Sequence, residues 1–417
     1  MLRRQAGAHA LVPPADPVGL TPVIDLEDAV PLLHHALRSR TNTGTSGTRR
    51  LVLLGGLQQS CSGPSDYYCA FAHALNRTAT LVPDDGKTTV VLPWTCSWQE
   101  NGNSLRRCLA KLSSTSSPAV LMLHKLHVGG QYKKKMELVR SHRCRLEAVY
   151  TPDDPDASTG VLERDTGVPW HYLGYASSFG DRTWRRALER ASQIAAATHE
   201  PAYVHDVGFS GGWQRFSGRY AFRAELFVRG GVVSRLRAEK WLRFYLPSNK
   251  LPDDKYALAL YTTKIWLSTT EGDSAGPRYL DIMSSGRAML LCNRHPKAYA
   301  PLGIVEGEHA AMFNSSAEFE AKLRHYLAHE AERLELVRAA KRLANERHTW
   351  DHRAQQLVRS LPADGCKAAP LRPRCRLCAR KSTARGVEQC AEWSGTPRAA
   401  VDSVVAPAIP SPAWSSL

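Results

Sequence analysis

Short apolar runs alternate with helical patterns along this chain, and the alternation starts twice, which limits the fold more than any other feature. The first series opens with Leu51–Leu54 and the turn Gly55–Gly56, and the second opens with Tyr203–Phe209 and the turn Gly211–Gly212. A strand, a glycine turn and a helix, in that order, make the opening unit of a doubly wound domain. The sequence therefore predicts an α/β fold with two Rossmann-like domains, each built on a parallel sheet, that face a cleft.

The expected elements follow one another closely, as they do in such domains. We expect strands at 51–54, 89–92, 119–123, 146–150, 203–209, 264–268 and 288–292, and helices at 65–75, 104–112, 133–140, 182–197, 220–227, 256–262 and 279–284. Ser315 and Glu318 fit a capping box, and apolar residues recur at helical spacing after them. We expect this last helical pattern to run toward Leu357.

The length of 417 residues exceeds what one hydrophobic core supports, which is roughly 250 to 300 residues. We therefore divide the chain into four regions. Residues 1–50 are expected to form an N-terminal extension and linker, 51–200 a first Rossmann-like domain, 201–360 a second one, and 361–417 a mostly disordered tail that contains cysteines.

The charge of the chain is strongly positive, with 55 Lys and Arg against 39 Asp and Glu, or +16 overall. Such an excess favours nucleic acid, an acidic membrane surface or a diphosphate ligand as partner. The basic residues are scattered, apart from short groups such as Lys133–Lys135, which is typical of a solvated surface. No nucleic-acid-binding motif is present, so nucleic acid is not the expected partner. No apolar run reaches the roughly 18 residues of a membrane span.

The ten cysteines fall into two groups. Six are irregularly spaced in the body of the chain, which predicts reduced thiols and a cytoplasmic setting. These six are Cys61, Cys69, Cys96, Cys108, Cys144 and Cys292. The other four, Cys366, Cys375, Cys378 and Cys390, lie in a basic, Pro-rich tail and include one C-x2-C pair. They could hold zinc, but few apolar residues surround them, so a zinc knuckle and an unstructured tail both stay open.

The segment Thr269–Gly286 is the most specific part of the sequence, because it follows a predicted strand directly, is rich in small residues and leads into a helix. Pro277–Gly286, with Lys264–Leu267 before it and Ala288–Leu291 after it, resembles the C-terminal domain of group-one glycosyltransferases. The closest likeness is to the CgeB-type, spore-maturation glycosyltransferase-like branch. The stretch Asp206–Gly211 resembles the opening strand and loop of that branch.

Two later segments, Glu306–Glu308 and His348–Arg353, resemble its late loop and closing helix. The likeness covers about residues 203–358, and residues 51–200 only in general pattern. It implies a GT-B fold, in which 51–200 would be the acceptor-side domain and 201–360 the donor-binding glycosyltransferase domain.

The resemblance also implies roles for individual residues. In the wider family, two Glu separated by seven residues bind the donor sugar and the nucleotide ribose. Asp273 and Asp281 have this spacing here, each one methylene shorter, so the resemblance places Asp273 toward the sugar and Asp281 on the ribose. Arg278 and the Gly211 loop would contact the phosphates through a guanidinium fork and backbone N–H groups. The donor-binding candidates are Gly211, Gly212, Glu271, Ser274, Gly276, Arg278 and Asp281. Asp281 could instead cap the helix while Arg278 pairs with a nearby acid.

Two further features lie in the first half. His124 follows the predicted strand 119–123, where a base could meet an acceptor hydroxyl, so we include it with Asp273 as a catalytic candidate. The D-x-D triplet Asp154–Asp156 would bind a metal–nucleotide complex in a GT-A enzyme. Its Pro-containing setting favours a solvated turn instead.

The main hypothesis is a metal-independent glycosyltransferase that moves a sugar from a nucleotide diphosphate sugar to an unknown acceptor. No cofactor beyond that co-substrate is expected, and no metal site. A second hypothesis is a non-catalytic nucleotide- or carbohydrate-binding descendant of the same fold, because both acids are shortened. A third, less favoured, is a basic nucleic-acid-associated protein.

Overall fold

The computed structural model describes the central part of the chain. The described residues are 49–54, 66–83, 88–92, 105–106, 109–110, 117–124, 126, 132–177, 181–198, 203–211, 221–228, 230–247, 251–270 and 274–361. The expected N-terminal extension and the four tail cysteines lie outside them, and the expected helix 104–112 is described only in part.

The first half of the described chain forms a six-stranded sheet in the order β2-β1-β3-β4-β5-β6. Every neighbouring pair is parallel. The strands are β1 (Arg50–Leu53), β2 (Thr80–Leu81), β3 (Val90–Leu92), β4 (Ala119–Met122), β5 (Leu146–Thr151) and β6 (Trp170–Tyr172).

The second half forms a five-stranded sheet in the order β11-β10-β9-β7-β8, again with every neighbouring pair parallel. Its strands are β7 (His205–Gly208), β8 (Phe244–Tyr245), β9 (Thr263–Ser268), β10 (Met289–Asn293) and β11 (Ala311–Phe313). The expected α/β class with two parallel sheets is confirmed.

The two sheets wind in the same way. In each, the first strand pairs with the second on one side and with the third on the other, and the later strands add outward from the third. The winding therefore reverses between β1 and β3 in the first sheet and between β7 and β9 in the second. Ligands of open α/β sheets bind outside the carboxyl ends of the strands at such a reversal. A ligand of the second half is therefore expected to bind at the β7–β9 reversal.

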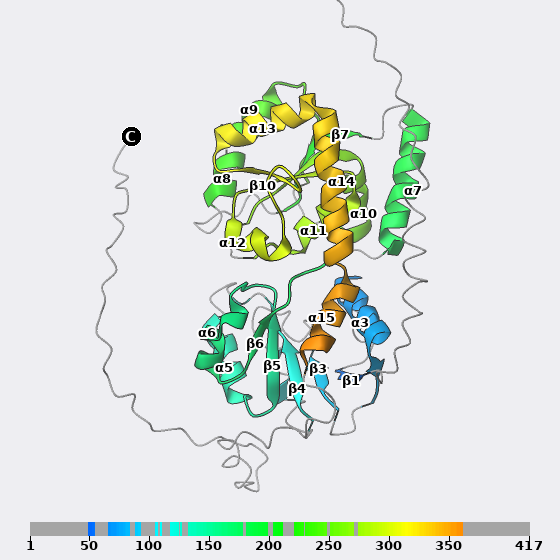
Figure 1. Cartoon of the computed structure of the whole chain (residues 1–417). Helices are drawn as coiled ribbons and strands as arrows, with labels where there is room; N and C mark the ends of the chain where they lie inside the picture. Colours follow the sequence, from blue (N-terminus) through cyan, green and yellow to red (C-terminus); the bar gives the residue numbers. More distant parts are fainter. Residues whose placement is uncertain are drawn as a thin grey trace, which may run out of the picture. The chain divides into compact units, whose positions relative to one another are not determined.

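Helices cover both faces of each sheet (Figure 1). They are α3 (Asp66–Thr78), α5 (Tyr132–Ser141), α6 (Val161–Thr166), α7 (Asp181–Thr198), α8 (Ala221–Phe227), α9 (Val232–Ala238), α10 (Asp253–Tyr261), α11 (Pro277–Ser285), α12 (Pro296–Tyr299), α13 (Ser316–Ala328), α14 (Glu330–Arg347) and α15 (Trp350–Ser360). Around the first sheet, α5 and α6 lie on one side and α3 and α15 on the other (Figure 1).

Successive residues along the strands of the first sheet pack into two separate hydrophobic cores. Leu51 and Val120 belong to the cluster that contains residues of α3 and α15, whereas Val52 and Leu121 belong to the cluster that contains residues of α5 and α6. Because a strand points successive side chains to opposite faces, a sheet covered on both sides needs uninterrupted apolar runs. This requirement explains why the short apolar runs in the sequence were good predictors of strands.

The C-terminal helical region differs from the expectation of one long pattern. It breaks at His329 and again at residues 348–349, which gives α13, α14 and α15. The predicted cap of α13 is present, since the Ser315 side chain accepts a hydrogen bond from the Glu318 backbone N–H. A second cap starts α15, where Thr349 accepts from the backbone N–H of His352. Such caps accept hydrogen bonds from the first backbone N–H groups of a helix, which have no partner within the helix. The helical spacing of apolar residues therefore continues although the chain forms three separate helices.

The last helix, α15, packs against α3 of the first half (Figure 1). The hydroxyl of Tyr150 on β5 lies 2.7 Å from that of Ser360, and the guanidinium of Arg49 donates to the carbonyl of Leu361 at 3.0 Å. The chain therefore returns to its first sheet after completing the second one.

The cysteine expectation needs correction. Cys69 and Cys144 are each disulfide-bonded, so the prediction of reduced thiols is wrong at these two positions. Cys292 is a buried free thiol, as expected. The irregular spacing of the six cysteines carried no information on which of them are bonded. In the described part of the chain, no helix has the length and apolar character to cross a membrane.

The close contact between Gly208 of β7 and the Trp266 ring of β9 can be tested by substitution. It pairs with Trp266, and a Cβ at position 208 would lie 2.4 Å from that buried ring. We expect Gly208→Ala to lower the free energy of unfolding by about 1–3 kcal/mol, because the ring has no room to move. The measurement is the denaturant midpoint. Gly276→Ser, at a position with nothing within 4 Å, is the control and should change the free energy by less than about 0.5 kcal/mol.

Candidate functional site

The carboxyl ends of β7 and β9 bring together two of the predicted site residues. Gly211 follows β7, and Arg278 lies in the first turn of α11, after the loop that follows β9. A Cβ at position 211 would lie 3.2 Å from Nη1 of Arg278, so the guanidinium lies directly against the Gly211 backbone. A side chain at 211 would push the guanidinium away. The structure thus places a cation beside an open backbone segment at the β7–β9 reversal.

The amino end of α11 adds to this positive environment. Gly276 is its N-cap and Pro277 its first residue, so the helix presents backbone N–H groups without a capping side chain over them. A helix N-terminus carries a partial positive charge, and Arg278 adds a full one. Together they form an arrangement suited to an anionic group such as a diphosphate.

The loop after β9 is held by two residues that sequence reasoning missed. The side-chain amide of Asn293, at the end of β10, accepts from the backbone N–H of Thr270 at 2.8 Å and donates to its carbonyl at 2.7 Å. The guanidinium of Arg223 on α8 donates to the hydroxyl and the carbonyl of Thr269 at 2.8 and 2.9 Å. Asn293 could have been found as a polar residue that ends an apolar run, but nothing in the sequence marks Arg223.

Asp281 is buried at 3% exposure one turn further along α11. Its Oδ1 accepts a hydrogen bond of 3.1 Å from the Ser177 hydroxyl, which belongs to the segment after β6. The buried Tyr256 hydroxyl lies near it: burial raises the pKa of Tyr256, the Asp281 charge raises it further, and Arg278 opposes the rise. Arg278, Asp281 and Tyr256 thus form one interacting group beside the amino end of α11.

Tyr279 of α11 packs against Tyr299, close to Cys292 of β10. The Tyr299 hydroxyl donates to the Asn293 carbonyl at 2.8 Å and lies 3.3 Å from the hydroxyl of Tyr279. Burial raises the pKa of the neighbouring Cys292 thiol to about 12. Because the thiolate is the nucleophilic form, Cys292 is a packing residue and not a reactive one.

The remaining donor candidates divide into two sets. Glu271, Asp273 and Gly212 lie outside the described residues. Ser274 donates through its hydroxyl to the carbonyl of Pro152 at 2.7 Å, and Gly276 has open space around its Cα. Ser274 therefore links the loop after β9 to the end of β5.

The two features of the first half have local partners. His124 follows β4 and is only 4% exposed, and the buried Lys135 ammonium donates to its backbone carbonyl at 2.9 Å. The D-x-D triplet forms a turn, as expected: the backbone N–H of Asp156 donates to Asp154, and the carboxylate of Asp156 pairs with Lys297 at 2.9 Å.

A buried polar group fixes the segment that carries Ser177. Nε2 of His348 lies 2.8 Å from the carbonyl of Leu302, so it must donate, and Nδ1 then accepts from Arg353. The Arg353 guanidinium also donates to the carbonyl of Tyr175 at 3.0 Å, and the Trp350 indole donates to that of Ser177 at 2.8 Å. The start of α15 therefore holds the backbone on which the partner of Asp281 sits.

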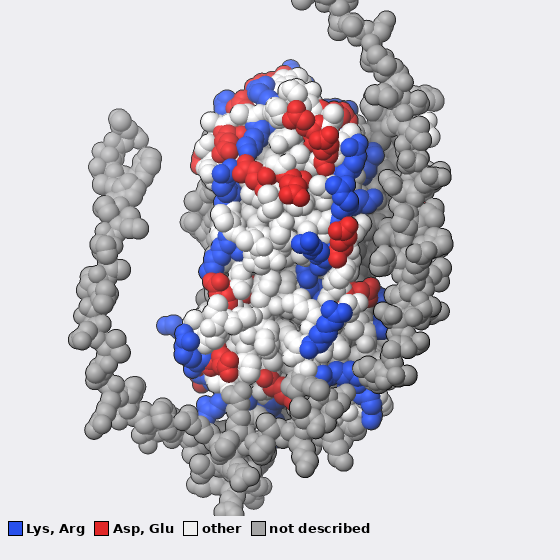
Figure 2. Space-filling model, viewed as in Figure 1, with Lys and Arg blue, Asp and Glu red and all other residues white. Residues whose placement is uncertain are grey.

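Surface charge is mixed on the face seen in Figure 2. Asp and Glu side chains are most frequent in its upper part, Lys and Arg lie at several places along its sides, and the middle carries few charges of either sign. This mixture agrees with the scattered basic residues of the sequence.

Comparison with known proteins bears on the second half. Residues 223–359 match the family model described as glycosyl transferase-like. The chain contains a glycosyl transferase-like domain. The match includes Arg278, Asp281, Asn293 and the start of α15, and it confirms the expected assignment at this general level. A comparison with curated proteins finds no match.

Several solved structures are similar in architecture. They include sucrose-phosphate synthase from Thermosynechococcus elongatus (11% identity, 66% of this chain and 72% of that one, TM-score 0.44). Anabaena HepE in complex with UDP-glucose shows 11% identity over 75% of this chain and 98% of its own, with a TM-score of 0.44. An E. coli structure described as trehalose-6-phosphate bound with UDP-2-fluoro glucose shows 9% identity over 75% and 98%, with a TM-score of 0.47. The two parallel sheets themselves, and not these scores, define the architecture of this chain.

The His348 group predicts a pH dependence. Burial, and then the Arg353 charge, lower the pKa of His348 from 6.5 to about 4. Between these values the unfolded chain binds a proton that the folded chain does not, so stability falls as the pH drops below 6.5. At pH 5 this amounts to about 2 kcal/mol. In His348→Gln, the loss of unfolding free energy between pH 7 and pH 5 should be smaller by that amount. His73→Gln, at an exposed position on α3, should keep the wild-type difference; equal losses in all three proteins would contradict the assignment.

Proposed function

We propose that this protein is a glycosyltransferase that transfers a sugar from a nucleotide diphosphate sugar, bound by its second half, to an acceptor hydroxyl. The contact of the Arg278 guanidinium with the Gly211 backbone at the β7–β9 reversal carries the proposal. It places a cation, a helix N-terminus and open backbone where ligands of such sheets bind. The family match over residues 223–359 supports the reaction class.

Arg278 and the amino end of α11 would act on the diphosphate. Glycosyl transfer passes through an oxocarbenium-like transition state while negative charge builds on the leaving diphosphate. Fixed donors at that position stabilise the developing charge without reorganising during the reaction. This arrangement would supply the positive charge from the protein, which supports a metal-independent reaction.

Asp281 is proposed to bind the ribose, and Asp273, with Glu271, to lie toward the sugar. The carboxylate of Asp281 already accepts one hydroxyl, that of Ser177, and a ribose offers the same kind of donor. The CgeB-type branch is proposed on the Arg278–Asp281 spacing that the sequence shares with it. His124 stays the candidate base of the first half, although its 4% exposure means that an acceptor hydroxyl would reach it only after neighbouring groups move.

The role of Arg278 can be tested by nucleotide affinity. Loss of a charge-assisted hydrogen bond costs about 1.5–3 kcal/mol, so Arg278→Ala should weaken binding of the preferred nucleoside diphosphate about tenfold to one-hundredfold. The affinity of Arg278→Lys should lie between those of the wild type and Arg278→Ala, because an ammonium keeps the charge but cannot form the bidentate contact. Isothermal titration with UDP, GDP and ADP measures the effect. Arg338→Ala on the exposed side of α14 removes the same charge elsewhere, and an equal loss there would show a general charge effect.

Asp281 and Ser177 separate a ligand role from a structural one. Asp281→Asn should weaken binding of the nucleotide sugar about tenfold, because it removes charge-assisted bonds to the ribose hydroxyls. Ser177→Ala removes only the internal hydrogen bond and should leave the affinity within about twofold. If both variants lower the melting temperature and neither changes the affinity, Asp281 has a structural role and the ribose site lies elsewhere.

Turnover decides between the two functions that share this site. Release of nucleoside diphosphate from a sugar nucleotide, abolished in Arg278→Ala, would establish transfer or its hydrolytic side reaction. Tight nucleotide binding with no turnover over a panel of acceptors would favour the non-catalytic binding descendant.

A further inference from the structure

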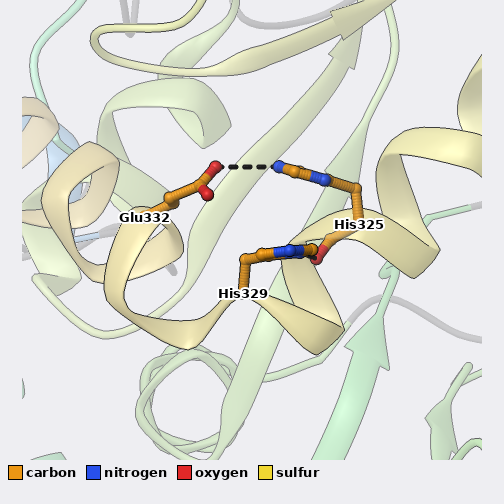
Figure 3. A group of neighbouring side chains, drawn as sticks. All are labelled: His325, His329 and Glu332. Atoms are coloured by element: carbon orange, nitrogen blue, oxygen red, sulfur yellow. Dashed lines mark hydrogen bonds and ion pairs between the residues drawn. The ribbon is translucent and has the colours of Figure 1, made fainter.

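Three potential metal-binding side chains meet at the junction of α13 and α14 (Figure 3). His325 lies in the last turn of α13, His329 is the single residue between the helices, and Glu332 lies in the first turn of α14. One ligand atom from each lies within 4.8 Å of the others, and all three side chains are exposed. None of them belongs to the candidate donor site.

The hydrogen bond that His329 makes through Nδ1 leaves its Nε2 available to bind a metal ion. Its Nδ1 lies 2.8 Å from the backbone carbonyl oxygen of His325. A carbonyl oxygen only accepts, so Nδ1 carries the hydrogen, and Nε2 of the neutral ring keeps its lone pair. Metal-binding histidines are commonly oriented by this kind of bond from the other ring nitrogen to a backbone carbonyl.

The other two ligands face each other, and the ring of His329 lies against that of His325. Nε2 of His325 lies 2.8 Å from Oε2 of Glu332. The rings of His325 and His329 stack with centroids 4.2 Å apart and an angle of 22° between their planes. Figure 3 shows the two rings one above the other, with the carboxylate facing His325. The three positions are i, i+4 and i+7, a spacing that places them on one helix face, and they stay close across the break at His329.

The spacing suits a tetrahedral ion once the stacked rings turn so that both lone pairs face it. With metal–ligand distances of about 2.0–2.2 Å, two ligands of a tetrahedral zinc ion lie about 3.4 Å apart. Ligand atoms within 4.8 Å of one another reach this spacing by rotating exposed side chains. The ion would replace the His325–Glu332 hydrogen bond, since it binds both of those groups.

We propose that His325, His329 and Glu332 bind one divalent transition-metal ion, with water in the fourth position. Two imidazoles and one carboxylate favour Zn²⁺, Ni²⁺ or Cu²⁺ over Mg²⁺ and Ca²⁺, which prefer sets of oxygen ligands. The ion joins the end of α13 to the start of α14. Because α13 packs on β11 and α14 on α11 and β10, the ion fixes how these helices sit on the second sheet. The proposal is independent of sugar transfer.

The test is a Zn²⁺ titration of the full chain after treatment with a chelator. Calorimetry should show binding at one site, and Zn²⁺ should raise the melting temperature, because an ion that binds only the folded state stabilises it. His325→Gln, His329→Gln and Glu332→Gln should each weaken the Zn²⁺ Kd at least tenfold and remove that rise. His73→Gln controls for loss of an exposed histidine and should bind as wild type. Unchanged Zn²⁺ affinity in the three site variants overturns the proposal.

The tail cysteines are alternative zinc ligands, so a variant that lacks two of them is needed. The full chain with Cys375→Ser and Cys378→Ser should keep the site, and its complex with Co²⁺ should lack the sulfur-to-metal charge-transfer band that thiolate ligands produce. Adding His329→Gln to that protein should then abolish binding. If the cysteine variant alone loses all binding, the tail and not the helix junction holds the metal, and the proposal is wrong.

Discussion

The parallel pairing of β7 with β9 determines where the candidate site lies. The pairing joins the two strands at which the winding of the second sheet reverses. Gly208 leaves room for the ring of its pairing partner Trp266, which a side chain at position 208 would displace. Gly211 follows β7, the loop before α11 follows β9, and the Arg278 guanidinium lies against the Gly211 backbone. A change in the register of this pair would separate the cation from that backbone.

A second set of contacts ties this site to the first half of the chain. The segment after β6 is held by Arg353 and Trp350 of α15, and it supplies the hydroxyl that Asp281 accepts. Ser274 makes a further bond to the carbonyl of Pro152. The candidate donor residues therefore share hydrogen bonds with two backbone segments of the first half, one after β5 and one after β6. A ligand that competes for Asp281 or Ser274 would act on these contacts as well as on its own binding site.

The sequence predicted the fold well where one rule governed the residues. Buried parallel strands need apolar runs, and helices need caps such as Ser315, so both were readable. Short strands with polar residues, such as Trp170–Tyr172, were not predicted, because they pair at a sheet edge and have no apolar run. The contact between Ser177 and Asp281 spans 104 positions and depends on the path of the whole chain. The break at His329 likewise has no Gly or Pro to mark it.

The hydrogen bond between Arg49 and the Leu361 carbonyl joins the first and last residues that the structure describes. Whatever precedes residue 49 and follows residue 361 is therefore attached at neighbouring points of the fold. The bond therefore couples the start of β1 to the end of α15, although 312 positions separate its two residues. A change that breaks it would loosen the opening strand of the first sheet and the last described helix together.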